Sequence, residues 1–318
     1  MASLSVPPAP TDPRRDAIDL YRAFRGLGCD STTVISILAH RDAPQRALIQ
    51  HEYAAIYRQH LYHRLASELS GNHKKAMLLW ILDPASRDAA ILHQALYGDV
   101  VTDMRAATEV VCSRTPLQLQ TMKQAYHARF GCHLENHVAE RTSSDHQRLL
   151  LAYLRCPRYE GPEVVDPAAA ARDARELYRA GERRLGTDER AFIRVFSERS
   201  WAHMASVAHA YQHMYDRSLE KAVKSETSGN FGFGLVTILR CADSPAKFFA
   251  KVLHKAMKGL GTNDTTLIRV VTTRAEIDMQ YIKAEFHRSY KRSLADAVHS
   301  ETSGNYRTFL LSLIGRDR

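Results

Sequence analysis

The sequence has no apolar run long enough to cross a membrane. Its longest runs, MLLWIL at 77–82 and LLLAYL at 149–154, fall far short of the roughly 20 residues that a spanning helix needs. The first residues, MASLSVPPAPTDPRR, also lack the apolar centre of a signal peptide. These absences argue against an integral membrane helix and predict a short N-terminal tail, residues 1–11, on a cytoplasmic protein.

Several motifs that carry chemistry are missing as well. The five cysteines include no CxxC pair, which fits reduced thiols rather than a disulfide framework. The 16 histidines form no HExxH motif, so they indicate solvated helix faces rather than a zinc site. The sequence also contains no GxxxxGK[ST] motif, so a nucleotide-hydrolysing P-loop is not supported.

The chain does carry an excess of positive charge. Its 44 Lys and Arg residues against 35 Asp and Glu residues give a formal net charge of +9. Such a charge favours anionic partners, either nucleic acid or an acidic lipid surface. Charge alone does not choose between them, although no recognition motif supports specific binding of nucleic acid.

One pattern occurs four times, with no gap inside any copy. The copies can be anchored at Gly26, Asp99, Arg184 and Gly259. Fifteen residues after the anchor stands an arginine, and forty-four residues after it a serine: Arg41, Arg114, Arg199 and Arg274, then Ser70, Ser143, Ser228 and Ser303. Self-similarity at a fixed period indicates a repeat protein.

The copies define the predicted domains. Repeat 1 covers 12–83, repeat 2 84–155, repeat 3 168–242 and repeat 4 243–315, with a connector at 156–167 that contains Pro and Gly. The chain is thus expected to form two pairs of repeats joined by this connector.

Each repeat is predicted to contain five helices and no strand. In repeat 4, apolar residues recur at helical spacing over 248–256, 267–271, 277–290, 294–298 and 306–314. Thr262 and Asn263 are expected to cap the second of these helices. The fold class is therefore predicted to be all-α.

Two loops in each repeat are richer in small and polar residues than helices require. The loop at the anchor can turn on its glycines and direct several carbonyl oxygens inward. The other loop, written SETSGN in repeats 3 and 4, carries a glutamate forty-two residues after the anchor, at Glu68, Glu226 and Glu301. Carbonyls with one carboxylate form an oxygen-only site that suits Ca²⁺, with water or a lipid phosphate completing the shell.

Helix capping is the alternative explanation for either loop taken alone. Repeat 2 bears on the choice, because it has Asp99 and Val101 in place of the glycines, Arg141 in place of the glutamate and Ser144 in place of the second loop's glycine. Both loops are lost together while the framework positions remain. This paired loss favours a joint binding role, and repeat 2 is predicted to bind no calcium.

These residues resemble those of the annexin family, and of its plant branch. The resemblance rests on four repeats of about 70 residues, on GLGTND with SETSGNY, and on GLGCDS with ELSGNH. It implies a curved disc of four five-helix repeats that binds phosphatidylserine-like acidic membranes peripherally when calcium is present. It also implies a monomer in solution that can assemble on membranes, with roles in membrane trafficking, calcium signalling and stress response.

The resemblance assigns the Ca²⁺ ligands to backbone oxygens and one carboxylate in each repeat. They are Phe24, Gly26, Gly28 and Glu68 in repeat 1; Met257, Gly259, Gly261 and Glu301 in repeat 4; and Arg184, Gly186 and Glu226 in repeat 3. Cys29 stands where a threonine is usual, and Arg184 stands at the first glycine position, so the turn of repeat 3 is expected to differ.

Other features of the family are weaker in this chain. Cys112 and Cys241 match a proposed redox cluster, but Thr108 replaces its methionine, and buried core thiols are the favoured interpretation. His40 matches a suggested haem contact, although a structural role is favoured, so no enzyme is predicted. The FIRVF stretch at 192–196 is close to a triplet linked with actin, which raises F-actin as a partner, but it also suits a buried helix.

Overall fold

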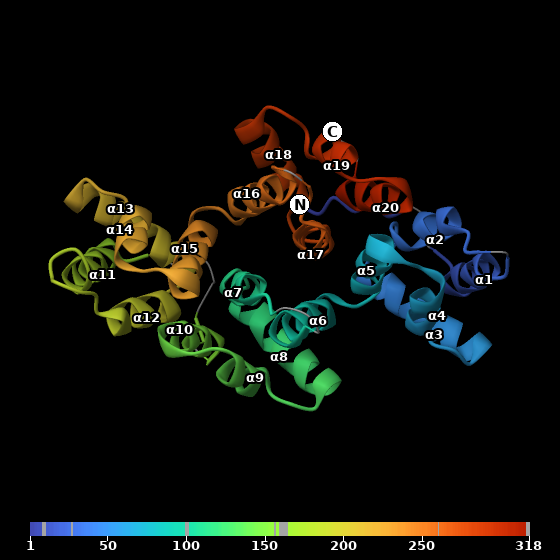
Figure 1. Cartoon of the computed structure of the whole chain (residues 1–318), viewed down its shortest axis with the longest axis horizontal. Helices are drawn as coiled ribbons and strands as arrows, with labels where there is room; N and C mark the ends of the chain where they lie inside the picture. The colour runs from blue at the N-terminus through green and yellow to red at the C-terminus, as the bar shows by residue number, and fades with distance from the viewer. Residues whose placement is uncertain are drawn as a thin grey trace. The chain divides into compact units, whose positions relative to one another are not determined.

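The computed structural model describes residues 1–7, 11–26, 28–98, 102–155, 157–158, 165–259 and 261–315. Within these residues the chain forms twenty α-helices and no strand, which confirms the predicted all-α fold (Figure 1). Repeat 1 contains α1 Pro13–Ala23, α2 Ser31–Leu38, α3 Ala43–Tyr57, α4 Leu61–Glu68 and α5 Gly71–Trp80. Repeat 2 contains α6 Pro84–Tyr97, α7 Met104–Cys112, α8 Pro116–Phe130, α9 Leu134–Arg141 and α10 Ser144–Arg155.

The second half repeats this order of helices. Repeat 3 contains α11 Pro167–Ala180, α12 Glu189–Glu198, α13 Trp201–Tyr215, α14 Leu219–Glu226 and α15 Gly229–Asp243. Repeat 4 contains α16 Pro245–Met257, α17 Asp264–Arg274, α18 Met279–Tyr290, α19 Leu294–Glu301 and α20 Gly304–Ile314. Most of the predicted connector, including Cys156, lies outside the described residues.

The second helix of every repeat begins at a side-chain cap. Asp30, Asp103, Asp188 and Asn263 each accept a hydrogen bond from the backbone N–H three residues on. Such caps satisfy a backbone donor that the first helical turn leaves without a partner. Of the two predicted caps in repeat 4, Asn263 is therefore correct and Thr262 is wrong.

The serines of the SETSGN loops do not cap the last helices. Ser70, Ser228 and Ser303 occupy the N-cap position, yet their side chains make no capping hydrogen bond. The chain turns instead at the next residue, which is a glycine in the left-handed conformation. Its φ is +58°, +60° and +57° at Gly71, Gly229 and Gly304. Ser144 holds the same conformation in repeat 2, with φ 54° and a side chain that disfavours it.

One predicted helix is shorter than its apolar pattern suggested. The pattern in repeat 4 begins at Ile277, whereas α18 begins at Met279 and Ile277 lies in the preceding turn. Ile277 and Tyr281 are both exposed, while Ile282 and Phe286 face the core. The turn arises because Arg274 at the end of α17 forms an ion pair with Asp278, which is the residue before α18.

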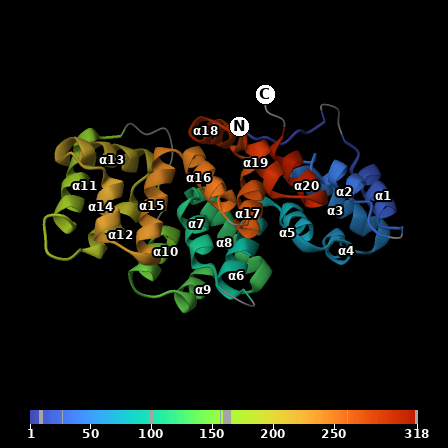
Figure 2. The same ribbon diagram turned by 45° about the horizontal axis from the view of Figure 1, so that its top comes forward.

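The helices pack into two compact units. Unit 1 consists of Met1–Arg87 and Phe249–Arg318, and unit 2 of Asp88–Phe248. Unit 1 therefore joins repeat 1 to repeat 4, and within it α5 packs against α17 and α20 (Figures 1 and 2). Unit 2 joins repeat 2 to repeat 3, where α15 packs against α7 and α10. Repeat 1 thus packs with repeat 4, and repeat 2 with repeat 3. The connector, in contrast, divides the chain between repeat 2 and repeat 3.

The arginine found at the end of the second helix has an acidic partner in each repeat. Arg41, Arg114 and Arg199 form two-point contacts with Asp16, Asp88 and Asp173, at shortest distances of 2.7, 2.7 and 2.8 Å. These aspartates lie on the first helix of each repeat. Repeat 4 has no such aspartate, and Arg274 instead pairs with Asp278 at 2.6 Å and lies over the ring of Phe249. Each ion pair thus joins the end of the second helix to a neighbouring segment of the same repeat.

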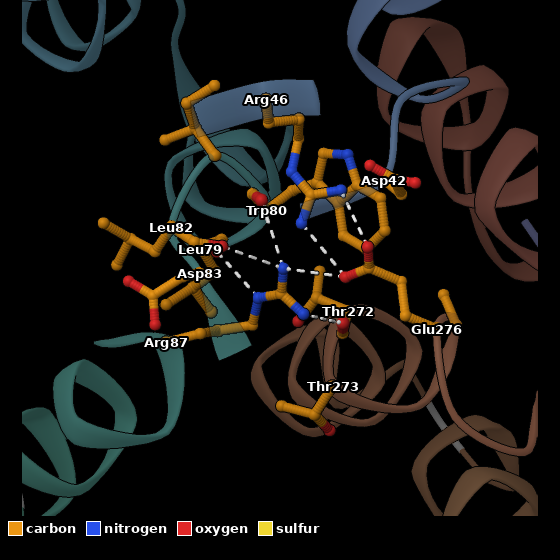
Figure 3. A network of polar contacts seen from close by, with 12 residues as sticks. Asp42, Arg46, Leu79, Trp80, Leu82, Asp83, Arg87, Thr272, Thr273 and Glu276 are labelled. Carbon is orange, nitrogen blue, oxygen red and sulfur yellow. Dashed lines mark hydrogen bonds and ion pairs between the residues drawn. The ribbon is translucent and has the colours of Figure 1, made fainter. Parts of the chain in front are cut away.

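A second ion-pair network lies within unit 1 and joins residues of repeats 1 and 4 with Arg87 at the start of α6 (Figure 3). Glu276, between α17 and α18, accepts hydrogen bonds from Arg46 of α3 at 3.1 and 3.0 Å and from Arg87 of α6 at 3.5 Å. The two guanidinium groups are 1% and 2% exposed, and both lie over the ring of Trp80. Arg87 also donates to the carbonyl of Thr272 at 2.5 Å. Glu276 therefore neutralises two buried cations at once.

We expect Glu276→Gln to lower the free energy of unfolding by about 3 kcal/mol, because it removes the carboxylate that two buried guanidinium groups contact. Urea denaturation followed by circular dichroism measures the loss. Glu285→Gln is the control, since Glu285 pairs with the exposed Arg288 and such surface pairs contribute less than about 1 kcal/mol. Equal effects of the two substitutions would contradict the role given to Glu276.

The strained conformation at Ser144 gives a second prediction. Ser144→Gly should raise the free energy of unfolding by about 1 kcal/mol, because glycine adopts a positive φ without the cost that a Cβ brings. Gly71→Ser is the matched opposite change in repeat 1, where the space around the Cβ is open and only the backbone conformation opposes a side chain. The same denaturation measurement should show a loss there, and a gain in both variants would refute the argument.

Candidate functional site

The loop before the second helix folds back on the helix that precedes it. The N–H groups of Asp30, Asp188 and Asn263 donate to the carbonyls of Ala23, Ala180 and Ala256 at 2.9, 2.7 and 2.8 Å. Asp103 makes the same bond to Ala95 in repeat 2, although Asp99 and Val101 lie outside the described residues. This closure is thus part of the fold and does not depend on the glycines.

The glycines set the path of the backbone inside these closed loops. Gly28, Gly186 and Gly261 share a positive φ of +93°, +79° and +91°, and Gly259 has +131°. Arg184, at the position of Gly259, has no positive φ. Gly26, at the same position in repeat 1, has no positive φ either, so the predicted change of turn in repeat 3 stays a prediction, while Gly186 keeps the conformation shared by the second glycines.

In repeats 3 and 4 a threonine joins the two predicted calcium loops. The Thr262 hydroxyl donates to Oε2 of Glu301 at 2.6 Å, and the Thr187 hydroxyl donates to Oε2 of Glu226 at 2.9 Å. Each bond connects the loop before the second helix with the end of the fourth helix. The carboxylate is thereby held beside the glycine turn by a neutral donor, which leaves its negative charge uncompensated.

The carbonyl oxygens of the repeat 4 loop are available as ligands. Among the described residues, no hydrogen bond ends on the carbonyl oxygen of Met257, Gly259 or Gly261. In repeat 3 the residue aligned with Met257 is Glu182, whose side chain accepts hydrogen bonds from Tyr211 and Arg217. Repeat 4 therefore offers the predicted carbonyl ligands without the side-chain hydrogen bonds that Glu182 makes at the same place in repeat 3.

Repeat 1 is built differently from repeats 3 and 4. Cys29 replaces the threonine, and Glu68 instead forms an ion pair with Arg64, at 2.9 Å between Nη2 and Oε1. The same Nη2 donates to the carbonyl of Phe24 at 2.9 Å. Burial raises the pKa of the Cys29 thiol, with nearby Glu68 and Asp30 adding to the effect, so a neutral thiol stands at this position. The sequence comparison had not considered Arg64, since its role depends on where its side chain points.

The glutamate loops of repeats 1 and 4 lie next to each other within unit 1. Together they line an open polar cavity of about 350 Å³, with Glu68, Ser70 and Asn72 from repeat 1. Ser303, Asn305 and Tyr306 line it from repeat 4. The glutamate loop of repeat 1 is therefore adjacent to the residues that follow Glu301 in repeat 4.

Repeat 2 has no acceptor at the glutamate position. Arg141 lies over the ring of Tyr97 at 4.0 Å and is 3.9 Å from Glu140. The Tyr97 hydroxyl donates to Glu140 at 2.5 Å. A cationic side chain that is held by its neighbours thus stands where the other repeats have a carboxylate.

An apolar side chain projects from the loop of repeat 3. Leu185 is fully exposed, at 103% of its reference area, between Arg184 and Gly186. Leu27 and Leu260, at the same position in repeats 1 and 4, lie outside the described residues.

The remaining family features have structural roles. Cys112 and Cys241 are buried, and burial raises the pKa of Cys112 to about 12, which leaves a neutral and unreactive thiol. The ring Nδ1 of His40 is 3.0 Å from the carbonyl of Ser5, so this histidine contacts the N-terminal segment. In the FIRVF stretch, the side chains of Phe192, Val195 and Phe196 are buried in α12.

Two features of the described residues bear on the class of site. None of the described helices has the length and apolar character needed to span a membrane. No group of three or more His, Cys, Asp or Glu side chains in the described ranges is placed to hold a metal ion.

Comparison with known proteins identifies the family. The annexin family model matches four segments, residues 15–80, 87–153, 172–238 and 248–313. The chain is 49% identical to annexin D5 of Arabidopsis thaliana, over 99% of each chain. It is similar to the structure of annexin III, with a TM-score of 0.95, 35% identity and coverage of 100% of this chain and 98% of that one.

A calcium-bound relative extends the comparison. The structure titled calcium-bound annexin (Sm)1 superimposes with a TM-score of 0.85 and 28% identity, covering 99% of this chain and 93% of that chain. The four matched segments, the close plant relative and the shared fold confirm the resemblance found in the sequence. The chain belongs to the annexin family and to its plant type, a family of Ca²⁺-binding proteins that associate with phospholipid membranes and are not typically enzymes.

Proposed function

We propose that this chain binds acidic phospholipid surfaces in the cytoplasm, peripherally and only when calcium is present. The loops of repeat 4 and repeat 1 are the main sites, and repeat 3 is a further site. Repeat 2 takes no part, because Arg141 stands in place of the glutamate. Membrane trafficking, calcium signalling and stress response are the processes that such binding would serve.

The threonine-to-glutamate hydrogen bond is the observation that carries this proposal. In repeats 3 and 4 it places a carboxylate beside a loop whose glycines turn the backbone. A bond that served only to cap a helix would not need to join two separate loops. The shared contact therefore supports a common role for the paired loops as one binding site.

The chemistry of the donors fits calcium. Ca²⁺ takes six to eight oxygen ligands in flexible geometry, and backbone carbonyls with a glutamate are among its usual ligands. Met257, Gly259, Gly261 and Glu301 would hold the ion in repeat 4, and the ion would link the protein to lipid phosphate oxygens. One carboxylate leaves the site short of charge and of ligands, so a phosphate from an acidic lipid is a natural further ligand.

Exposed apolar and basic groups would add to membrane contact. Leu185 is available for insertion at the boundary between headgroups and acyl chains. The net charge of +9 adds a long-range attraction to acidic lipid. We do not include F-actin among the partners, because the apolar residues of the FIRVF stretch are buried.

We expect the double variant Glu68→Gln, Glu301→Gln to need at least tenfold more calcium for half-maximal co-sedimentation with phosphatidylserine liposomes. Each change removes the carboxylate of one site and keeps its size. Glu52→Gln with Glu198→Gln is the control, since it makes the same change in charge on α3 and α12, outside the loops. Unaltered calcium dependence in the first variant would refute the assignment, and wild-type binding without calcium would point to the basic surface instead.

The role of the threonine can be tested separately. Thr262→Val keeps the shape of the side chain but removes a hydrogen bond to a carboxylate, an interaction of about 1.5–3 kcal/mol. The calcium midpoint for liposome binding should rise about tenfold as Glu301 loses its orientation. Thr308→Val removes an exposed hydroxyl on α20 and should leave the midpoint unchanged. If the two variants behave alike, the bond does not position the site.

A further inference from the structure

Repeat 1 differs from the other two candidate sites at one position on its fourth helix. Four residues before the glutamate, repeats 3 and 4 have Ala222 and Ala297, whereas repeat 1 has Arg64. This spacing places the two side chains one turn apart on the same face of α4, which allows them to meet. An arginine in place of alanine would need no explanation on a solvated helix face. The Arg64 side chain, however, is directed toward the loop before α2.

Arg64 contacts the two groups that repeat 1 would use to bind calcium. Its Nη2 is 2.9 Å from the carbonyl oxygen of Phe24 and 2.9 Å from Oε1 of Glu68. Its guanidinium carbon lies 5.7 Å from the centre of the Phe24 ring, and its Nε is buried without a hydrogen-bond partner. One cationic nitrogen thus joins the backbone oxygen of the first loop to the carboxylate of the second.

The contact also explains how Glu68 is held without a threonine. In repeats 3 and 4 a neutral hydroxyl orients the carboxylate and leaves its charge for a cation. Cys29 offers only a weak S–H donor at that position, and the positive charge of Arg64 takes the place of the hydroxyl. The oxygen pair of repeat 1 is therefore already neutralised within the protein.

We propose that Arg64 is a tethered cation that closes the repeat 1 site and competes with calcium for Phe24 and Glu68. This inference rests on the proposed function of the loops and adds a regulatory step to it. Calcium must displace the guanidinium before it can bind, and no such displacement is needed in repeat 4. Repeat 4 therefore fills first as calcium rises, and repeat 1 responds at a higher concentration.

Displacement is possible because the pair lies near the surface. The side chains of Arg64 and Glu68 are 32% and 20% exposed, so water can take over the hydrogen bonds of the released guanidinium. A released arginine beside a membrane could also form a two-point contact with a lipid phosphate. An acidic surface would then favour the open form of the loop.

The test isolates repeat 1 in the full-length protein. Glu226→Gln with Glu301→Gln removes the carboxylates of repeats 3 and 4, and calcium chloride is titrated calorimetrically into this background with and without Arg64→Ala. We expect Arg64→Ala to tighten calcium binding about tenfold, because calcium no longer displaces charge-assisted hydrogen bonds. Arg22→Ala is the control, since it removes the same charge from the exposed pair with Asp19 on α1. Unchanged or weaker binding in Arg64→Ala, or equal tightening in Arg22→Ala, would overturn the proposal.

A second measurement needs no calcium and separates this proposal from the function it rests on. Amide hydrogen exchange of the 24–30 loop should be several-fold faster in Arg64→Ala than in wild type, in calcium-free buffer. Absence of calcium binding in the wild type would refute the proposed function, and exchange would still decide whether Arg64 closes the loop. Unchanged exchange in that variant would show that Arg64 does not hold the loop.

Discussion

An arginine keeps its charge wherever the fold places it, and this constraint organises both units. A guanidinium does not lose its proton in a protein, so a buried one needs a carboxylate or several carbonyl oxygens around it. Arg41 and Arg114 meet this need through an aspartate on the first helix of their repeat. Arg46 and Arg87 meet it through Glu276, which lies 230 and 189 residues farther along the chain. That shared carboxylate is one of the contacts between repeat 1 and repeat 4, beside the packing of α5 against α17 and α20.

The repeat architecture was accessible from the sequence because one chain contains four versions of it. Fixed spacing revealed the arginines, the number of helices and the positions of Glu68, Glu226 and Glu301. The aspartate partners of these arginines were missed. Asp88 and Asp173 stand eleven residues before their anchors and Asp16 stands ten before its own, and repeat 4 lacks the residue altogether. A one-residue shift and one exception were enough to hide the pairing.

The details of the loops were less accessible, since they depend on side-chain direction. A serine before a helix normally caps it, yet Ser70, Ser228 and Ser303 do not. The adjacent glycines turn the chain with a positive φ that no pattern of polar residues predicts. Thr262 had the sequence context of a cap and instead donates across to Glu301. The error at Thr262 arises because the two loops meet only in the folded repeat.

The same pairing of arginine with carboxylate serves two different purposes, and the groups that it joins separate them. Exposure of the arginine alone does not, since Arg199 at the end of α12 is 36% exposed in its pair with Asp173 of α11. The side chains of Arg114 and Arg274 are 2% and 5% exposed, so breaking their pairs would strand a charge away from water. The 32% exposure of Arg64 lowers that penalty, because solvent can stabilise either partner once they part. A deeply buried pair therefore acts as a fastener, whereas a partly exposed pair built from ligand groups can exchange its cation. In repeat 1 an exchangeable ion pair holds the glutamate, whereas in repeats 3 and 4 a neutral threonine hydroxyl holds it. The three sites therefore differ in how readily they accept a cation.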